Sequence, residues 1–174
     1  IDPAQTDDDY PAKNFNVVIF DGNGGSNAVT GLGFKPDLIW GFTRDGGQSK
    51  RMIDSTRGGS SRMYSDLDSA ESTGTATISE FGTDGFTATG GAFNNDSGKT
   101  CGSWCWKANG GTTTSFSAGG NQLAGTYQAN TKSKFSIITY TGSGSANSEV
   151  LHGLGATPNF IIFKARNDTH WWGV

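Results

Sequence analysis

Short apolar runs, separated by glycine-rich turns, recur along the whole chain. The Asp-Gly and Asn-Gly pairs in these turns favour the positive φ angles that tight hairpins need, and the clearest hairpin signal is Thr83-Asp84-Gly85-Phe86. Runs of this length and spacing predict an all-β fold in which two sheets form a sandwich of the jelly-roll type. We expect strands at 15–20, 27–30, 37–43, 50–54, 75–81, 84–89 and 101–107.

Two runs are apolar on both faces, which is typical of a strand in the middle of a sheet. They are Asp37-Leu38-Ile39-Trp40 and Phe160-Ile161-Ile162-Phe163. Because neither run alternates between apolar and polar residues, we expect both to be central strands that are covered on each side.

The pattern that begins at Phe15 recurs at Phe135. The first copy reads FNVVIFDGNGG and then GLGFKPDLIWGFTRD, and the second reads FSIITYTGSGS and then HGLGATPNFIIFKARND. A duplication of this kind predicts two related modules in one chain. The aligned pairs include Phe15 with Phe135, Pro36 with Pro158, and Arg44 with Arg166.

The repeat and the local composition together divide the chain into parts. The second copy breaks off at Val174 and the chain begins at Ile1 rather than Met, so we expect a fragment of a longer protein. The expected parts are an extended N-terminal docking arm at 1–14, a β-sandwich module at 15–108, a Gly/Thr/Ser-rich linker at 109–133, and the start of a second, truncated β-sandwich module at 134–174.

The arm combines two prolines with an acidic run and few apolar residues. One interpretation is a solvated lead-in to the first strand. The alternative is a segment that docks on a neighbouring subunit, with Asp7, Asp8, Asp9 and Tyr10 as the docking residues. Calcium binding is disfavoured because these aspartates lack the ligand spacing of an EF-hand loop.

Composition narrows the function classes. The net charge is −3 and no basic stripe is present, which disfavours nucleic acid as a partner. No run approaches the roughly 18 apolar residues of a membrane-spanning helix, so we expect no membrane insertion. The 11 Phe, 5 Trp and 4 Tyr residues indicate a folded core despite the 27 glycines.

The two cysteines, Cys101 and Cys105, lie in one expected strand. Their Cα atoms would be about 13 Å apart at about 3.3 Å per residue, beyond the roughly 7 Å limit of a disulfide. Zinc would need more ligands than these cysteines and the two histidines of the chain offer. We therefore expect free, partly buried thiols, and neither a metal nor a cofactor.

No arrangement of residues indicates catalysis. Glycoside hydrolysis needs two carboxylates about 5 to 9.5 Å apart, and the acidic residues are scattered without a pair on one strand face. No strand-to-helix Gly-x-Ser-x-Gly elbow is present, and His152, which precedes a Gly-Leu-Gly turn, indicates a capping or packing role. Asp54 and Arg57 are close enough to form an ion pair that holds their loop. We expect no catalytic residues and no enzymatic activity.

Sugar binding is supported better than catalysis, because exposed aromatic rings stack on pyranose faces. Trp104 and Trp106 alternate with Cys105, so both indoles point to one face of their strand. Packing in the core is the alternative for each tryptophan, as for Trp40. We expect the glycan-stacking residue to be one of Trp171 and Trp172, since neighbours on a strand face opposite ways.

Several motifs follow one another in a fixed order that resembles a known family. They resemble the repeated modules of large structural proteins that are encoded by tailed bacteriophages, especially those of marine bacteria and cyanobacteria. The second copy resembles the module that follows in those proteins, so the resemblance covers most of the chain. The motifs here are DGNGG at 21–25, GLGFKPDLIW at 31–40, DSTRGG at 54–59, AEST at 70–73, TDGF at 83–86 and WCWKA at 104–108.

The resemblance implies concanavalin A-like lectin/glucanase β-sandwich modules in tandem. It implies a virion structural protein without enzymatic activity, located at the virion surface as a tail fibre or host-attachment component. The expected partners are a tail adaptor or the capsid, further copies of the chain with a trimer favoured, and host surface glycans. Two alternatives stay open: a capsid decoration or head-fibre protein, and a lectin-fold module that binds or hydrolyses glycans.

Overall fold

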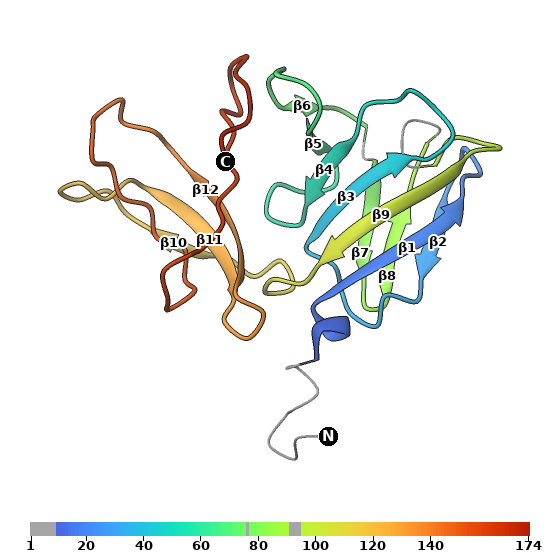
Figure 1. Cartoon of the computed structure of the whole chain (residues 1–174), viewed down its shortest axis with the longest axis horizontal. Helices are drawn as coiled ribbons and strands as arrows, with labels where there is room; N and C mark the ends of the chain where they lie inside the picture. The colour runs from blue at the N-terminus through green and yellow to red at the C-terminus, as the bar shows by residue number, and fades with distance from the viewer. Residues whose placement is uncertain (1–9, 76, 91–94) are drawn as a thin grey trace.

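The chain is an all-β protein, as the sequence predicts. The computed structural model describes residues 10–75, 77–90 and 95–174 (Figure 1). Within them, the only helical element is the short 3-10 turn η2 (Pro11–Lys13). The strands are β1 (Phe15–Asp21), β2 (Asn27–Thr30), β3 (Leu38–Thr43), β4 (Arg51–Asp54), β5 (Ser61–Tyr64), β6 (Ser72–Thr73), β7 (Ile78–Gly82), β8 (Gly85–Ala88), β9 (Thr100–Trp106), β10 (Thr114–Phe116), β11 (Gly125–Asn130) and β12 (Phe135–Tyr140).

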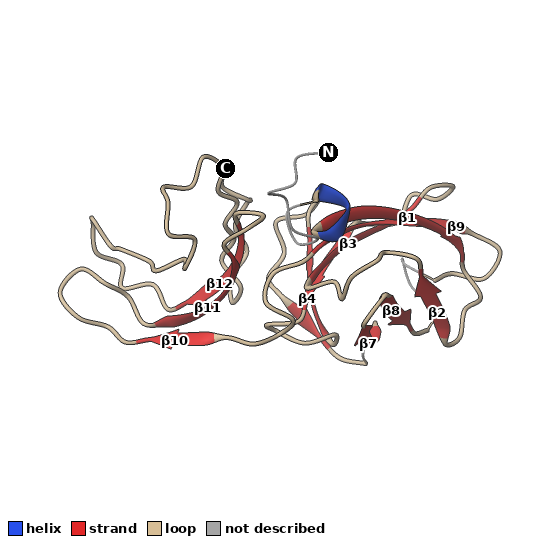
Figure 2. Ribbon diagram, turned by 90° about the horizontal axis from the view of Figure 1, so that it is seen from below, coloured by secondary structure: helices blue, strands red, loops and turns tan. Residues whose placement is uncertain are grey.

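Two antiparallel sheets form a β-sandwich, which we call the first unit. The larger sheet has six strands in the order β1-β9-β3-β4-β5-β6, and the smaller has the order β2-β8-β7. Figure 2 shows the larger sheet arching over β2, β7 and β8. β9 is the last strand of this unit along the chain, yet it lies between β1 and β3.

The core of the first unit lies between these two sheets. Alternate residues of each strand point into it, because successive side chains of a strand face opposite ways. Burial of one such aliphatic or aromatic side chain stabilises the fold by about 1.5–3 kcal/mol. The buried cluster consists of Val29, Leu32, Phe34, Ile39, Ile53, Ile78, Phe86, Ala88 and Cys105.

Each copy of the repeat contains a Gly-Leu-Gly turn, at 31–33 in the first copy and at 153–155 in the second. Gly31 and Gly33 have φ angles of 92° and 80°, which favour glycine, and their N–H groups donate to the carboxylate of Asp84. In the second copy the equivalent turn also has positive φ angles, and His152 Nδ1 accepts a hydrogen bond from the N–H of Leu154. Of the two roles expected for His152, capping is confirmed.

A third antiparallel sheet, in the order β10-β11-β12, lies beside the sandwich (Figure 1). Together with residues 141–174 it forms what we call the second unit. The segment 109–133, expected to be a linker, contributes β10 and β11 to this sheet. Its few apolar residues account for the difference, since the rings of Phe116 and Tyr127 pack 6.1 Å apart on adjacent strands. The linker is therefore shorter than the composition indicates.

The expectation for Phe160-Ile161-Ile162-Phe163 is wrong. These side chains are exposed, from 38% for Ile162 to 69% for Phe160, rather than covered on both faces. Among the described residues, the only backbone pairing of this segment joins Phe163 to Gly173. Apolar composition produces a buried strand only where neighbouring strands are present to cover it. The first run of this type, in β3, does lie between β9 and β4 and is central as expected.

The N-terminal arm differs in part from an extended segment. Residues 1–9, which include the docking candidates Asp7, Asp8 and Asp9, lie outside the described residues. Tyr10 is the first described residue, and its carbonyl oxygen accepts hydrogen bonds from Lys13 N and Asn14 Nδ2. Pro11 fixes φ at the start of this 3-10 turn, so the chain turns just before β1.

Candidate functional site

The outward side of the six-stranded sheet carries a row of apolar and aromatic side chains. In β1, Val18 and Phe20 pack against the core, so the alternating residues point to the other side. The same alternation operates in β3 and β9, where Ile39 and Cys105 belong to the core. We call the resulting surface the outer aromatic face. Its residues are Phe15, Val17, Ile19, Leu38, Trp40, Phe42, Trp104 and Trp106.

Trp104 lies at the centre of the outer aromatic face. Its ring meets those of Trp40 and Phe42 edge-on, with centroids 5.4 Å and 6.0 Å away. The strand register places Val17 directly opposite Trp104 on β1. Trp104 remains 42% exposed and Ile19 50% exposed. Contiguous exposed apolar patches are typical of interaction surfaces.

The second unit already covers one end of the outer aromatic face. The ring of Phe135, the first residue of β12, stacks on Trp106 at 6.1 Å and an interplanar angle of 22°. Trp106 also contacts Phe15 at 4.9 Å and Trp40 at 6.4 Å. The half of the face around Trp104 thus remains open, while the half around Trp106 is an internal contact.

A buried network of hydrogen bonds, which we call the polar joint, connects the two units. Asp37 at the start of β3 is fully buried, and its Oδ2 accepts hydrogen bonds from the N–H groups of Ala108 and Gly110. Its Oδ1 accepts a third from the hydroxyl of Ser55 at 2.6 Å. A carboxylate with three donors is satisfied away from water, so Asp37 has a structural role.

Gln128 of β11 forms the other half of the polar joint. Its Nε2 donates to the hydroxyls of Ser55 and Thr56, at 2.9 Å and 2.6 Å. Its Oε1 accepts from the N–H groups of Asn109 and Gly111. The side chain is 1% exposed, and every polar atom of its amide has a partner. Gln128 therefore fixes the second sheet to the sandwich.

A chain of ion pairs makes a second connection between the units. The nearly buried guanidinium of Arg57 donates to carboxylate oxygens of both Asp54 and Glu71. The carboxylate of Glu71 in turn accepts two hydrogen bonds from the guanidinium of Arg166 in the second unit, at 2.9 Å and 2.7 Å. The pairing of Asp54 with Arg57 confirms the expectation from their spacing. The side chain of Glu71 is only 9% exposed.

The ionisation of Glu71 reflects these partners. Burial alone would raise its pKa, but the hydrogen bonds from Arg166 and Arg57 outweigh burial and leave the pKa below its ordinary value. The same contact raises the pKa of Arg166. Glu71 is thus held as a carboxylate between two cations, which suits a structural ion pair better than a proton-transfer role.

The shifted pKa values elsewhere also have structural causes. Burial raises the pKa of the Cys105 thiol to about 12 and lowers that of Arg51 to about 10. The N–H groups of Gly33 and Gly31 lower the pKa of Asp84. Both cysteines are free, as expected, but they are fully rather than partly buried. Across residues 10–75, 77–90 and 95–174, no three His, Cys, Asp or Glu side chains lie together to hold a metal ion.

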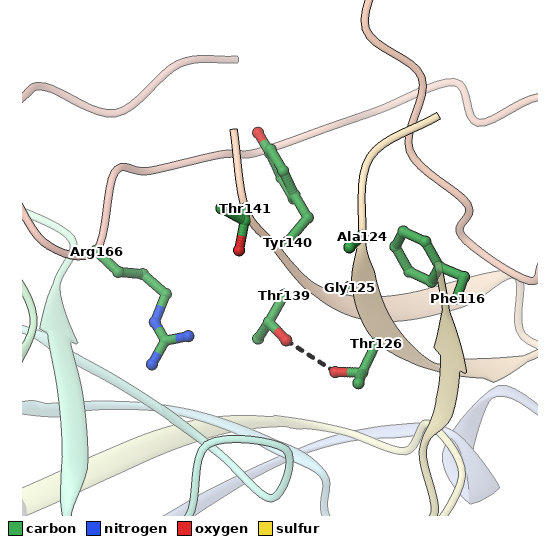
Figure 3. Close-up of a pocket in the computed structure, with 8 residues that line it drawn as sticks. All are labelled: Phe116, Ala124, Gly125, Thr126, Thr139, Tyr140, Thr141 and Arg166. Carbon is green, nitrogen blue, oxygen red and sulfur yellow. Dashed lines mark hydrogen bonds between the residues drawn. The ribbon is translucent and has the colours of Figure 1, made fainter. Parts of the chain in front are cut away.

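A shallow hollow of about 340 Å³ lies on the second unit beside Arg166 (Figure 3). The hydroxyls of Thr126 and Thr139 are 2.8 Å apart at its floor and already bond each other. The Arg166 guanidinium is committed to Glu71. The hollow therefore offers hydroxyls and the two rings of Phe116 and Tyr140 to a ligand, but no carboxylate. Its lining residues are Phe116, Ala124, Gly125, Thr126, Thr139, Tyr140, Thr141 and Arg166.

The residues singled out from the sequence lie in different places. Trp171 is 73% exposed, whereas Trp172 is half-buried and donates its indole N–H to the carbonyl oxygen of Tyr64. The two neighbours thus differ in exposure, and only Trp171 is free to stack on a ligand. Tyr10 is 36% exposed and precedes the 3-10 turn η2. These residues do not converge on one site.

The outer aromatic face was only partly anticipated from the sequence. Trp104 and Trp106 were expected to share one strand face, and they do. The contribution of β1 was missed, although the sequence FNVVIF carries apolar residues at both odd and even positions. An edge strand that is apolar on both faces indicates that its outward side is apolar too, and this signal could have identified the contribution of β1.

The molecule is thus a β-sandwich joined to a second, smaller antiparallel sheet. Its sequence matches one family model over residues 10–174, and the chain belongs to that family, which is described as Domain of unknown function (DUF7483). Comparison with curated proteins and with solved structures gives no match. Within the described residues, no helix is long and apolar enough to span a bilayer.

Proposed function

We propose that the chain is a non-enzymatic structural protein of a bacteriophage virion, most simply a tail-fibre or host-attachment component at the virion surface. The observation that carries the proposal is the polar joint between Asp37, Ser55 and Gln128. Units connected by a small or wet interface move relative to each other, whereas a buried and fully bonded joint resists bending. Stiffness between successive units is what a projecting fibre requires.

The duplicated sequence and the motif resemblance support the same proposal. A row of related units can form an elongated protein by repeating one type of contact, since each unit contacts only its neighbours. The partners in this proposal are other virion proteins and further copies of the chain, with a trimer favoured. Closed symmetry would cover exposed strand edges and apolar surface such as the outer aromatic face.

Labelling of virions tests the proposal. Antibodies against the purified chain would be bound to intact particles of the virus that encodes it and located with gold by electron microscopy. Gold at the tail tip or along fibres is the expected result. Gold spread over the head surface would favour the alternative of a capsid decoration or head-fibre protein. Intact particles without gold, from a preparation whose disrupted particles also fail to react, would rule out a virion role.

Glycan binding at the outer aromatic face is a second candidate function. The observation in its favour is the exposed indole of Trp104 beside Phe42, because sugars stack on such rings. The test is a glycan array probed with the wild-type chain, Trp104→Ala and Trp171→Ala. Loss of a signal in Trp104→Ala alone supports this face, and loss in Trp171→Ala alone supports the C-terminal tryptophan instead. No signal with the wild type removes the candidate.

A further inference from the structure

Two arginines of the first unit lie on the same inward side of adjacent strands. Ile53 of β4 belongs to the core, so Arg51, two residues earlier, points to the same side. The register pairs Arg51 with Tyr64 of β5, which places Tyr64 and Arg62 on that side as well. Arg62 is thus the diagonal neighbour of Arg51, at a spacing of about 7–8 Å that long side chains span.

Arg51 is held in a defined position by its neighbours. It is 4% exposed, and its Cζ lies 5.7 Å from the centroid of the Tyr64 ring. Its Nη1 donates to the hydroxyl oxygen of Thr77 at 3.1 Å. Because this hydroxyl accepts the bond, it keeps its own proton for a further acceptor. The interior at this end of the sandwich therefore contains a fixed cation and a hydroxyl donor beside it.

Arg62 lacks the partners that the chain gives to Arg57 and Arg166. Its Nε is buried and has no hydrogen-bond partner. Within the described part of the chain, the Arg62 guanidinium forms no ion pair, whereas Arg57 and Arg166 are both paired with Glu71. A buried donor without an acceptor is unfavourable. The geometry of Arg62 thus points to an acceptor that comes from outside the chain.

The positive charges of the two arginines act on each other. Burial is the main reason why the pKa of Arg51 falls to about 10, and the charge of Arg62 lowers this pKa further. The carboxylate of Asp96 acts in the opposite direction, but more weakly than Arg62 does. The pair is therefore a local concentration of positive charge, which an anion would relieve.

The site opens to solvent at the edge of the six-stranded sheet. β6 is the outermost strand, and its Ser72 lies opposite Arg62 (Figure 1). Gly74, just after β6, is exposed, and a Cβ there would lie 3.7 Å from Nη2 and 3.9 Å from Nη1 of Arg62. Because Gly74 has no side chain, it does not cover this end of the guanidinium.

We propose that Arg51 and Arg62 bind a doubly charged oxyanion, a phosphate or sulfate group, at this edge of the sandwich. The N–H groups of a guanidinium match the oxygens of such a group in pairs. Two cations balance its two negative charges, whereas a carboxylate would balance only one. The group is either a free ion or a substituent on a larger ligand, and the experiment separates these sources. This proposal does not depend on the virion role.

Titration of the complete chain with sodium sulfate tests the proposal. Isothermal titration calorimetry, with the ionic strength held constant by sodium chloride, should show saturable binding of one ion with a Kd below about 10 mM. In NMR spectra of the same titration, the Nε–H signal of Arg62 should shift with the same midpoint, because Nε gains an acceptor. The signal of Arg57, whose partners are already in place, should not shift.

A second titration identifies the source of the group. Glucose 6-sulfate that binds at least about tenfold more tightly than sulfate would indicate a substituent carried by a saccharide. Equal affinities would indicate a free ion. Inorganic phosphate should compete with sulfate in both cases, and glucose alone should not.

Variants assign the binding to the two arginines. Arg62→Gln removes one charge and should weaken sulfate binding at least about tenfold. Arg44→Gln is the matched control at an exposed arginine and should bind as the wild type does. Gly74→Asp adds a carboxylate beside the Arg62 guanidinium and should block the site, whereas the neutral Gly74→Asn should retain binding. If Arg62→Gln does not fold, the Nε–H signals of the wild type decide.

Three results would overturn the proposal. One is the absence of saturable binding by sulfate, phosphate and glucose 6-sulfate at constant ionic strength. Another is binding that leaves the Nε–H signal of Arg62 unmoved. The third is equal sulfate affinity in the wild type, Arg62→Gln and Gly74→Asp, because the ion would then bind elsewhere on the chain.

Discussion

Asp37 and Gln128, far apart in the sequence, are joined through a single hydroxyl. Ser55 donates to Asp37 Oδ1 at 2.6 Å and accepts from Gln128 Nε2 at 2.9 Å. Both side chains are buried, so water does not substitute for either bond. This short polar path is one of the contacts that orient the second sheet on the sandwich, beside the ion pairs of Glu71 and the stacking of Phe135 on Trp106.

Removal of the Gln128 amide should destabilise the chain and loosen the joint. Gln128→Leu leaves the N–H groups of Asn109 and Gly111 without their acceptor and removes both hydrogen bonds that the buried Gln128 amide donates, at an expected cost of about 1–3 kcal/mol. Urea unfolding measures the loss, and faster amide exchange in β10 to β12 would show that the second sheet has become mobile. The control Asn121→Ala, at an exposed position, should change neither.

Glu71 should make the stability depend on pH in the acidic range. Its folded-state pKa lies below the ordinary value of 4.5, so its contribution is complete above that value and is lost as pH falls through the folded pKa. Glu71→Gln should lower stability at pH 7 by about 1–3 kcal/mol, and the difference should shrink below pH 4. The test is to measure the urea midpoint of the wild type and of Glu71→Gln at several pH values in this range. If the difference between the two midpoints does not change with pH, Glu71 is not the titrating group.

The two outward tryptophans of β9 should behave differently. Trp106→Ala removes ring contacts with Phe15, Trp40 and Phe135, and should cost about 3–5 kcal/mol. Trp104→Ala should cost clearly less because its indole is 42% exposed, but should shorten retention on a hydrophobic column. Equal losses of stability in the two variants would contradict the assignment of the Trp106 half as an internal contact.

Gly59 should tolerate no side chain. A Cβ at this position would overlap the carbonyl oxygen of Ile78, a backbone atom that has little room to move. Gly59→Ala should therefore destabilise the sandwich by about 1–3 kcal/mol or more. Gly47→Ala is the matched control, since a Cβ there meets open space. Thermal unfolding of both variants distinguishes close packing from a general cost of replacing glycine.

The cysteines should resist modification while the chain is folded. Burial raises the pKa of Cys105 to about 12 and also raises that of Cys101, so little thiolate exists at pH 8. In the folded chain, the two thiols should be alkylated only as fast as the structure around them opens. In urea, both thiols should react immediately, which gives two equivalents of modified cysteine per chain. Rapid labelling of Cys105 in the native protein would show that β9 opens locally.

Much of the sandwich could be predicted from the pattern of apolar runs. Seven expected strands correspond to β1 to β4 and β7 to β9, because in them apolar periodicity and turn residues agree. β5 and β11 were missed, since Ser61–Tyr64 and Gly125–Asn130 are mostly polar and are strands only because a neighbouring strand offers its edge. A local pattern does not report such a neighbour.

The candidate sites were predictable to a smaller extent. The pair of Asp54 and Arg57 followed from their spacing, because both lie on one turn. The polar joint did not, since Asp37 and Gln128 are brought together only by the packing of two units. The apolar segment at 160–163 shows the opposite error: its composition predicts burial, but burial needs covering strands as well.

The place of β9 in the sheet also governs when the sandwich forms during synthesis. The ribosome releases β1 and β3 well before the strand that pairs with both, and their N–H and C=O groups toward β9 stay unpaired until Trp106 has emerged. Pairing across so much intervening chain is slow compared with hairpin closure. Folding of the sandwich is therefore a late event in the life of the nascent chain, and the unpaired edges need protection from aggregation until then.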